Sequence, residues 1–340
     1  MKILLIGGTG TISTSITKEL ISAGHEVYLL NRGNHPLPEG AKSILADVHN
    51  EQDTLGKIAP LGEWDCVCDF IAFSVDDVMR DYRLFKDRTA QFVFISSASA
   101  YRKPPISHII TEKTLLVNPF WEYSRKKIAC EEFLLGKYRE EGFPVTVIRP
   151  SHTYCEKSLP VGLHGEGGSY QVLLRMSQGK RIIVHGDGSS LWTLTNSDDF
   201  ARAFVPLLGN PATLGEAIQI TSDEVLSWNM IYRTIAEEMG VEYRPHYVSS
   251  YFLSDVAPKG QDFRGNLIGD KAECAVFDNS KLLSFVPGFK ARIPFREGVR
   301  RALKYLEENP SARVLDPEFD QWCDRVIDAL EDAKKVLTAE

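Results

Sequence analysis

The sequence has little of what would mark a membrane protein, a nucleic-acid-binding protein or a disulfide-stabilised domain. No apolar run in its 340 residues is long enough to span a bilayer, and its net charge of −7 argues against a basic binding face. The six cysteines lack zinc-ribbon spacing, and Cys66 and Cys68 alternate in an apolar segment, so we expect buried, reduced thiols. We therefore expect a cytoplasmic protein with no signal peptide, no metal site, and neither a membrane nor a nucleic-acid partner.

Short apolar runs alternate with amphipathic stretches up to Pro150, a pattern typical of an α/β fold with a parallel sheet. The content of 43% hydrophobic and 25% charged residues is ordinary for a globular protein. Residues 102–120 and 155–169 are expected to be loops, the second a mobile segment that covers a substrate. The expected strands are residues 2–6, 26–30, 43–46, 65–71, 91–97, 145–149, 181–184 and 217–221. The expected helices are residues 11–23, 76–87, 121–141, 170–178, 198–208, 227–239, 294–308 and 321–340.

The N-terminal segment carries the most informative motif of the chain. An apolar run ends in Gly-Gly-Thr-Gly at residues 7–10, and a helical pattern of apolar residues follows. A strand, a Gly-rich turn and a helix in this order aim backbone N–H groups at a pyrophosphate. Glycine suits the turn because a Cβ would hinder both the approach of a phosphate and a positive φ. Ser13 stands where the common motif has its third glycine. The residues expected to contact a dinucleotide here are Gly7, Thr9, Gly10, Thr11 and Ile12.

A second group of chemically capable residues lies far downstream. Tyr123 and Lys127 are four residues apart, which places them on one face of a helix. A nearby ammonium favours a phenolate, so we expect Lys127 to lower the pKa of Tyr123 from about 10. A tyrosine tuned in this way can exchange a proton with a hydroxyl or carbonyl oxygen. The apolar segment 91–95 is expected to deliver Ser96 and Ser97 to the carboxyl end of a sheet, where ligands bind in open α/β folds.

Each motif alone has a plain alternative, since Gly-rich turns occur in ordinary βα units and Tyr-x-x-x-Lys occurs on ordinary helix surfaces. Their combination is specific. The chain resembles the extended, atypical short-chain dehydrogenase/reductases of the NAD(P)-dependent sugar epimerase/dehydratase superfamily. The resemblance covers roughly residues 1–225 and specifies no substrate. The stretches that carry it are residues 7–10, 46–48, 96–101, 123–131, 148–150, 186–188 and 198–201.

The resemblance implies a Rossmann-type doubly wound parallel sheet with a smaller, discontinuous C-terminal substrate lobe. It places an NAD(P)-binding domain at residues 1–155, a return of the chain to that domain at about 180–222, and a mainly substrate-binding lobe at 156–340. It also implies a homodimer through helices 76–87 and 121–141. The further cofactor contacts that it implies are Asp47, Val48, Ala72, Ser96, Tyr123, Lys127, Pro150 and His152.

The end of the second expected strand bears on the choice of cofactor. An acidic residue there would bond the adenine ribose and repel a 2′-phosphate, but the chain has Asn31 and Arg32. The donor fork of an arginine suits a phosphate, so we expect NADP in preference to NAD. The alternative is that Arg32 stacks over adenine, which is compatible with NAD. By resemblance, Asp47 accepts from the adenine amine and Ala72 lines the nicotinamide-ribose side.

Three positions depart from the sugar-nucleotide pattern of the superfamily. His152 stands where epimerases have an asparagine, and either contacts substrate or packs in the interior. Trp192 stands where an arginine usually clamps the substrate diphosphate; it offers stacking and one N–H, or is a core residue. Residues 97–99 lack the Thr-Asp-Glu triad that 4,6-dehydratases of the superfamily need, which argues against a dehydratase. The expected substrate contacts are Ser97, Ser99, His152 and Trp192.

These residues together predict NAD(P)-dependent hydride transfer at a secondary alcohol or ketone of a sugar or sugar-like substrate, in an oxidoreductase or epimerase. Tyr123 is the expected general base, Lys127 lowers its pKa and grips the nicotinamide ribose, and Ser97 polarises the reacting oxygen. Two alternatives stay open. One is a one-way NADPH-dependent reductase that releases its cofactor each turnover. The other is a regulatory or RNA-binding relative of the chloroplast stem-loop-binding proteins, which the acidic charge disfavours.

Overall fold

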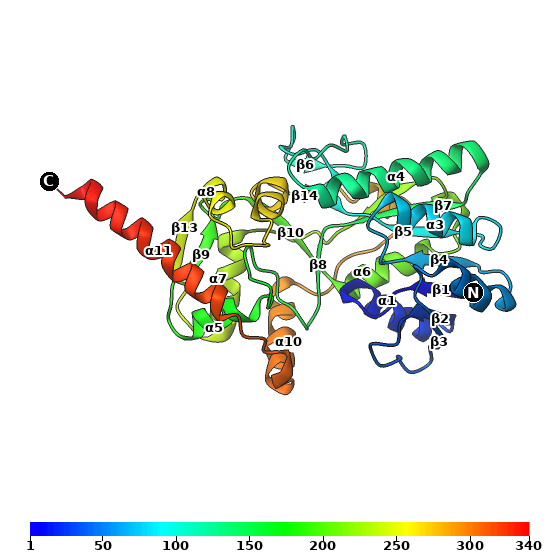
Figure 1. The fold of residues 1–340 in the computed structure, drawn as a ribbon, viewed down its shortest axis with the longest axis horizontal. Coiled ribbons are helices and arrows are strands. Elements are labelled where there is room, and N and C mark those ends of the chain that lie inside the picture. The colour runs from blue at the N-terminus through cyan, green and yellow to red at the C-terminus, as the bar shows by residue number, and fades with distance from the viewer. Residues whose placement is uncertain (340) are drawn as a thin grey trace.

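A seven-stranded, wholly parallel sheet is the largest sheet of the computed structural model, which describes residues 1–339, and lies on the right in Figure 1. Its strand order is β11-β7-β5-β4-β1-β2-β3, which confirms the predicted doubly wound sheet. The order changes direction between β1 and β4, and ligands of such sheets bind at this point, beyond the carboxyl ends of the strands. The strands are β1 (Lys2–Ile6), β2 (Glu26–Asn31), β3 (Lys42–Leu45), β4 (Cys66–Asp69), β5 (Phe92–Ile95), β7 (Val145–Pro150) and β11 (Ala217–Ile220).

Helices cover both faces of this sheet, which is why its central strands are apolar on both sides. Apolar side chains of α1, α6 and α9 pack in one hydrophobic cluster, and those of α2, α3 and α4 pack in another. Cys66 and Cys68 are free, buried and in the same cluster, as the alternation predicted. The helices are α1 (Thr11–Ser22), α2 (Glu51–Ile58), α3 (Val75–Phe85), α4 (Glu122–Glu141), α6 (Ser197–Phe204) and α9 (Ser280–Phe285).

A third hydrophobic cluster lies outside the large sheet, on its left in Figure 1, and is built mainly from residues after Pro150. Three small sheets surround it, with strand orders β12-β10-β8, β13-β9 and β14-β6. The strands are β6 (Ile109–Ile110), β8 (His152–Tyr154), β9 (Ile182–His185), β10 (Leu191–Asn196), β12 (Val225–Ser227), β13 (Pro245–Val248) and β14 (Val276–Phe277). The helices are α5 (Tyr170–Ser177), α7 (Trp228–Met239), α8 (Ser250–Asp255), the π-helix η5 (Arg264–Lys271), α10 (Phe295–Glu308) and α11 (Pro317–Thr338).

The chain passes between the large sheet and this third cluster more than once. Within the predicted return at 180–222, β11 pairs with β7 in the large sheet and α6 packs against α1. In contrast, β9 pairs with β13 outside it. Strand β6, from the expected loop 102–120, pairs with β14, so this loop also joins the two parts.

Several boundaries differ from the sequence prediction for identifiable reasons. The helix expected over 198–208 ends at Phe204 because Pro206 follows, and a 3₁₀ turn replaces its last part. Strand β5 ends early because Ser97 caps a 3₁₀ turn at Ala98–Ala100. The expected loop 155–169 contains isolated bridges but no helix or strand, and its mobility stays a prediction. Residue 340, where the last expected helix ends, lies outside the described residues; within residues 1–339 no helix is long and apolar enough to cross a membrane.

Candidate functional site

The Gly-rich turn leads from β1 into α1 at the carboxyl edge of the sheet. Gly7 and Gly8 have φ values of +103° and +89°, which favour glycine, and a Cβ on Gly8 would lie 2.6 Å from Leu29 Cδ2. The amide of Gly10, directly before α1, donates to Ser13 Oγ at 2.9 Å. Ser13 therefore caps the helix from the place where the common motif has glycine. The first-turn amides of α1 have no acceptor within the helix and suit an anion.

A groove of about 400 Å³ runs from this turn across the ends of β2 and β3. Sequence reasoning missed the aromatic and imidazole side chains that also line it, Phe73, His35 and His49. Thr11 and Ile12 lie at the start of α1 and are not among the residues that line the groove. The predicted contacts that do line it are Gly7, Thr9, Asn31, Arg32, Asp47 and Val48. The backbone donors at one end and polar side chains at the other fit a dinucleotide.

Arg32 projects from the end of β2 at the far part of this groove. Its side chain is exposed and, among residues 1–339, makes no hydrogen bond or ion pair. Asn31 Oδ1 accepts from the Gly33 amide at 2.9 Å and so fixes the turn that carries Arg32. Asp47 Oδ1 accepts from the His49 amide at 3.1 Å. Asn31 and Asp47, both predicted cofactor contacts, thus accept from backbone amides, and Arg32 is left available to a ligand.

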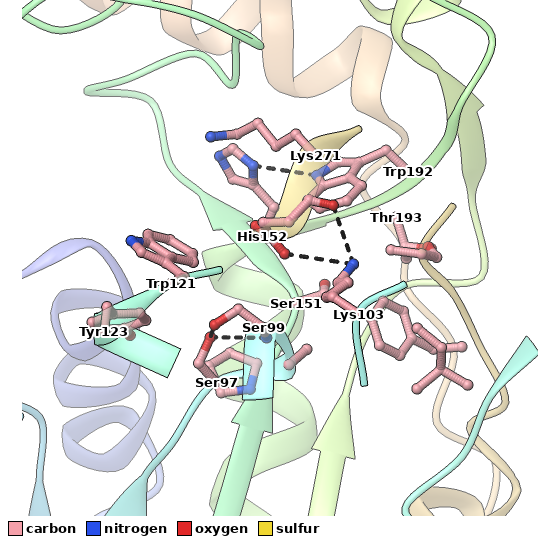
Figure 2. A pocket seen from close by; sticks show the side chains of 16 residues that line it. Ser97, Ser99, Lys103, Trp121, Tyr123, Ser151, His152, Trp192, Thr193 and Lys271 are labelled. Carbon is pink, nitrogen blue, oxygen red and sulfur yellow. Dashed lines mark hydrogen bonds and ion pairs between the residues drawn. The ribbon is translucent and has the colours of Figure 1, made fainter. Parts of the chain in front are cut away.

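A second cavity, of about 280 Å³, lies at the ends of β5 and β7 (Figure 2). Pro150, predicted as a cofactor contact, lines this cavity and not the groove. Phe73 borders the groove, and its ring centroid lies 6.2 Å from that of Tyr123, so the groove and the cavity meet at this aromatic pair. The predicted catalytic and substrate residues that line the cavity together are Ser97, Ser99, Tyr123, His152 and Trp192.

Hydroxyl groups form a short chain beside Tyr123, which lies in the first turn of α4. Ser97 Oγ accepts from the Ser99 amide at 3.1 Å and lies 2.9 Å from Ser99 Oγ. Ser99 Oγ in turn accepts from Ser124 Oγ at 2.8 Å. Burial raises the pKa of Tyr123, and its hydrogen bond with Ser97 opposes that rise. The phenol is therefore protonated at neutral pH and poised to donate.

Lys127 does not lower the pKa of Tyr123 as the sequence predicted, because its ammonium is hydrogen-bonded to backbone carbonyls and not to the phenol. The ammonium is buried and donates to the carbonyls of Ala72 at 2.7 Å and Ile95 at 2.8 Å, at the ends of β4 and β5. It also lies 4.6 Å from the Phe73 ring centroid. Burial lowers the pKa of Lys127 itself to about 8. Ala72, expected to line the ribose side, instead offers its carbonyl to this lysine and lines neither the groove nor the cavity.

Ser96 belongs to a buried ionic network behind the cavity. Its hydroxyl donates to Glu131, one helical turn beyond Lys127, and it lines neither the groove nor the cavity. Arg149 donates to Glu131 through Nε at 3.0 Å and through Nη2 at 2.5 Å, with both side chains almost fully buried. This pair ties β7 to α4, the helix that carries Tyr123. Ser96 therefore supports the packing of α4 behind the cavity, and its cofactor contact stays a prediction.

His152 and Trp192, which both depart from the usual pattern, contact each other and form part of the cavity wall (Figure 2). Trp192 Nε1 donates to His152 Nδ1 at 3.3 Å. Burial lowers the pKa of His152 to about 3, so the ring is neutral. Trp192 is only 3% exposed and packs against Trp228, with ring centroids 5.6 Å apart. It is thus both a core residue and a wall of the cavity.

The lining residues that were not found from the sequence include Lys103, Trp121, Asp270 and Lys271. Lys103 comes from the expected loop 102–120, and Asp270 and Lys271 come from the end of η5. None belongs to a spaced motif, so only the tertiary fold brings them to the cavity. Within residues 1–339 no cluster of three or more His, Cys, Asp or Glu side chains could hold a metal ion.

Comparison with known proteins gives a match to a family model and relatives of low sequence identity. The model of the NAD dependent epimerase/dehydratase family matches residues 71–221. The chain is 24% identical to a 2'-dehydrokanamycin reductase of Streptomyces kanamyceticus, over 86% of this chain and 81% of that protein. It is 23% identical to a putative UDP-glucose 4-epimerase of Methanocaldococcus jannaschii, over 90% and 99%. The fold matches dTDP-glucose 4,6-dehydratase of Bacillus anthracis, solved with NAD, at TM-score 0.71 and 18% identity, over 92% and 98% of the chains.

Proposed function

We propose that the chain is a member of the NAD dependent epimerase/dehydratase family, within the extended short-chain dehydrogenase/reductases, and that it transfers hydride at a secondary alcohol or ketone of a sugar-like substrate. The observation that carries the proposal is the meeting of the groove with the cavity at Phe73 and Tyr123. A nucleotide bound at residues 7–10 would extend along the groove toward that junction. The reacting carbon would lie on the other side, within reach of the phenol.

The proposed proton chemistry belongs to Tyr123 and Ser97. A protonated, buried phenol donates to the oxygen of a ketone as reduction proceeds, and accepts the proton back in the reverse direction. Ser97 Oγ, aligned by the Ser99 amide, holds the same oxygen by a hydrogen bond. When bound, the nicotinamide supplies or accepts the hydride. The residues present fit such a cofactor, because the Gly-rich turn borders the groove and Phe73 of the groove lies against Tyr123 of the cavity.

We propose that Lys127 acts on both the ribose and the proton transfer. Two of its three N–H groups are used by the Ala72 and Ile95 carbonyls, which leaves one for a ligand at the junction. Its ammonium lies 5.8 Å from the Tyr123 ring centroid, close enough to favour a developing phenolate in a buried site. Lys127 therefore helps Tyr123 to accept a proton when an alcohol is oxidised, even though burial raises the pKa of Tyr123 in the resting protein.

The cofactor proposed is NADP in preference to NAD. Arg32 is exposed at the adenine end of the groove without a protein partner among residues 1–339, and a 2′-phosphate would satisfy its donor fork. Stacking of Arg32 over adenine is the alternative, and it would serve NAD equally well.

A one-way reductase is the second candidate, and the cavity lining favours it over a nucleotide-sugar epimerase. Within the described residues no arginine lines the cavity, so nothing matches the usual clamp for a substrate diphosphate. Trp192 and Trp121 provide apolar walls instead. The similarity to a 2'-dehydrokanamycin reductase supports the same direction. The acidic net charge disfavours the RNA-binding alternative.

The test begins with the nucleotide. Protein purified under mild conditions is denatured, and the released nucleotide is identified by mass spectrometry; the protein is then titrated with NADPH and NADH and offered a panel of sugar ketones. Nucleotide binding and substrate-dependent oxidation of the reduced nucleotide are expected. A protein that binds neither nucleotide would contradict the proposal.

A further inference from the structure

The substrate cavity holds three charged side chains whose charges do not balance: Lys103, Asp270 and Lys271. Lys103 Nζ donates to the Asp270 carbonyl at 3.1 Å and lies 3.9 Å from its carboxylate. Lys271 Nζ donates to the neutral side-chain amide of Asn266. The lining thus contains two ammonium groups and one carboxylate, and the cavity carries a net positive charge.

Lys271 is the group left short of partners. Only 7% of the residue is exposed, and its ammonium has three N–H groups, of which Asn266 takes one. Leaving charged donors unpaired in a buried place is unfavourable. Burial lowers the pKa of Lys271 to about 8, so the ammonium keeps its proton at neutral pH. An anionic ligand group would supply both the missing acceptors and the missing charge.

The backbone of Lys271 is held in place by three side-chain donors. Its carbonyl accepts from Trp228 Nε1 at 3.1 Å, from His185 Nε2 at 3.1 Å and from Ser190 Oγ at 3.2 Å. Trp228 begins α7, His185 ends β9 and Ser190 directly precedes β10, so all three lie outside η5. They fix the end of η5, so the side chain of Lys271 leaves the backbone at a set position beside the cavity.

The rest of η5 is also placed by a close contact with the wall of the cavity. A Cβ on Gly269 would lie 2.9 Å from Trp121 Cβ, so this approach requires glycine. Asn118 Nδ2 donates to the Gly269 carbonyl at 2.7 Å and joins η5 to the segment before α4. The π-helical winding, common at functional sites, thus brings Lys271 to a cavity whose other side is formed by Tyr123.

His152 adds a second donor on the same wall. Trp192 Nε1 can only donate, so His152 Nδ1 accepts and the proton of the neutral ring is on Nε2. Figure 2 shows Lys271 and His152 together on one wall, with Ser97 and Ser99 on the opposite side. A substrate across the cavity would meet the reactive hydroxyls at one end and two N–H donors at the other.

We infer that Lys271 and the Nε2–H of His152 bind a carboxylate or phosphate group of the substrate, at the end remote from the oxygen that reacts at Tyr123. The inference rests on the proposed function and names its substrate class, a sugar acid or a sugar phosphate. A volume of about 280 Å³ is near the lower limit for ligand sites, which are roughly 300–1,000 Å³, and suits a monosaccharide. A carboxylate and a phosphate ester offer the same oxygen acceptors, so the experiment includes both.

Calorimetry on the NAD(P)-loaded protein tests this with four hexoses that differ in charge: glucuronate, glucose 6-phosphate, glucose and glucosamine. At least one anionic hexose is expected to bind about tenfold or more tightly than glucose, and glucosamine no more tightly than glucose. Lys271→Met keeps the length of the side chain and should weaken anion binding by roughly ten- to hundredfold, the range of one charge-assisted contact, while glucose binding stays within threefold. Lys259→Met, at an exposed lysine, is the matched control and should change nothing.

Equal affinity for the anionic and neutral hexoses, or unchanged anion affinity in a folded Lys271→Met protein, would overturn the inference. If the variant folds poorly, the wild-type comparison of charged with neutral hexoses decides alone. Binding is measured without turnover, so the two proposals can fail separately. A Lys271-dependent preference for anions in a protein that transfers no hydride would keep the binding site and remove the proposed reaction.

Discussion

Replacing Arg32 by alanine tests cofactor choice with little risk to the fold. The side chain is exposed and has no hydrogen bond or ion pair among residues 1–339, so its removal breaks no contact within the protein. The free energy of unfolding of Arg32→Ala should therefore stay within about 0.5 kcal/mol of wild type. Any change in nucleotide affinity then reports on the ligand alone.

The size of the expected change follows from the contact proposed. A hydrogen bond to a charged group contributes about 1.5–3 kcal/mol, and solvent at this open end of the groove favours the lower value. About 1.4 kcal/mol corresponds to a tenfold change in Kd. Arg32→Ala should thus weaken NADP binding about tenfold or somewhat more, and NAD binding by less than threefold.

Isothermal titration with both nucleotides, at low and at high salt, measures this directly. Arg139→Ala, an exposed arginine at the far end of α4, serves as the control and should leave both affinities unchanged. The NADP difference should shrink at high salt because the contact is exposed. Equal losses for NAD and NADP would refute a 2′-phosphate contact and assign Arg32 to stacking on adenine.

Four further outcomes are expected. Lys127→Met should weaken nucleotide binding and lower turnover, whereas Lys126→Met, at an exposed lysine, should change neither. Loss of turnover with unchanged nucleotide binding would contradict the proposed contact of Lys127 with the ribose. Burial lowers the pKa of Lys127 to about 8, so between about pH 8 and 10.5 the unfolded chain holds a proton on this lysine that the folded chain has lost. The free energy of unfolding of wild type should therefore rise relative to that of Lys127→Met as the pH rises through this window. A difference that does not change with pH would contradict the burial of the ammonium. Glu131→Ala leaves Arg149 buried without its carboxylate and should lower the free energy of unfolding by about 3–5 kcal/mol in urea titrations, against under 1 kcal/mol for exposed Glu132→Ala; equal losses would show that the ion pair contributes little. UDP-, GDP- and dTDP-hexoses should not raise the melting temperature appreciably. A ligand at a hundred times its Kd would stabilise the folded protein by about 2.7 kcal/mol. A rise in melting temperature that corresponds to this free energy, with any of the three, would support a nucleotide-sugar substrate.

The large sheet could be predicted because its strands carry their signal locally. Strands such as β1 and β5 are short apolar runs buried on both faces, and the Gly-rich turn after β1 marks the first βα unit. Helix α2 was missed because it is short, contains Gly56 and buries only two side chains. The strands outside the large sheet were mostly missed because β8 and β12 have three residues each, too few to show alternation.

The candidate site divides in the same way. Tyr123 and Ser97 were found because a helix spacing and a strand end place them without knowledge of the rest of the fold. The direction of the pKa shift at Tyr123 was wrong, because burial and the carbonyl partners of Lys127 are set by tertiary structure. Lys103 and Lys271 come from a loop and a π-helix far apart in sequence, and no local pattern connects them.

The turnover number of Tyr123→Phe measures the contribution of the Tyr123 phenol to the proposed proton transfer. The variant keeps the ring, so the aromatic contact with Phe73 and the nucleotide groove should persist. With the NADPH-dependent ketone reduction as the assay, turnover should fall by roughly 10²–10⁴ while nucleotide Kd stays within a few-fold. Tyr138→Phe, on the exposed part of the same helix, should retain full activity. Turnover of Tyr123→Phe within tenfold of wild type would show that the phenol does not take part in the reaction and would contradict the proposed proton transfer.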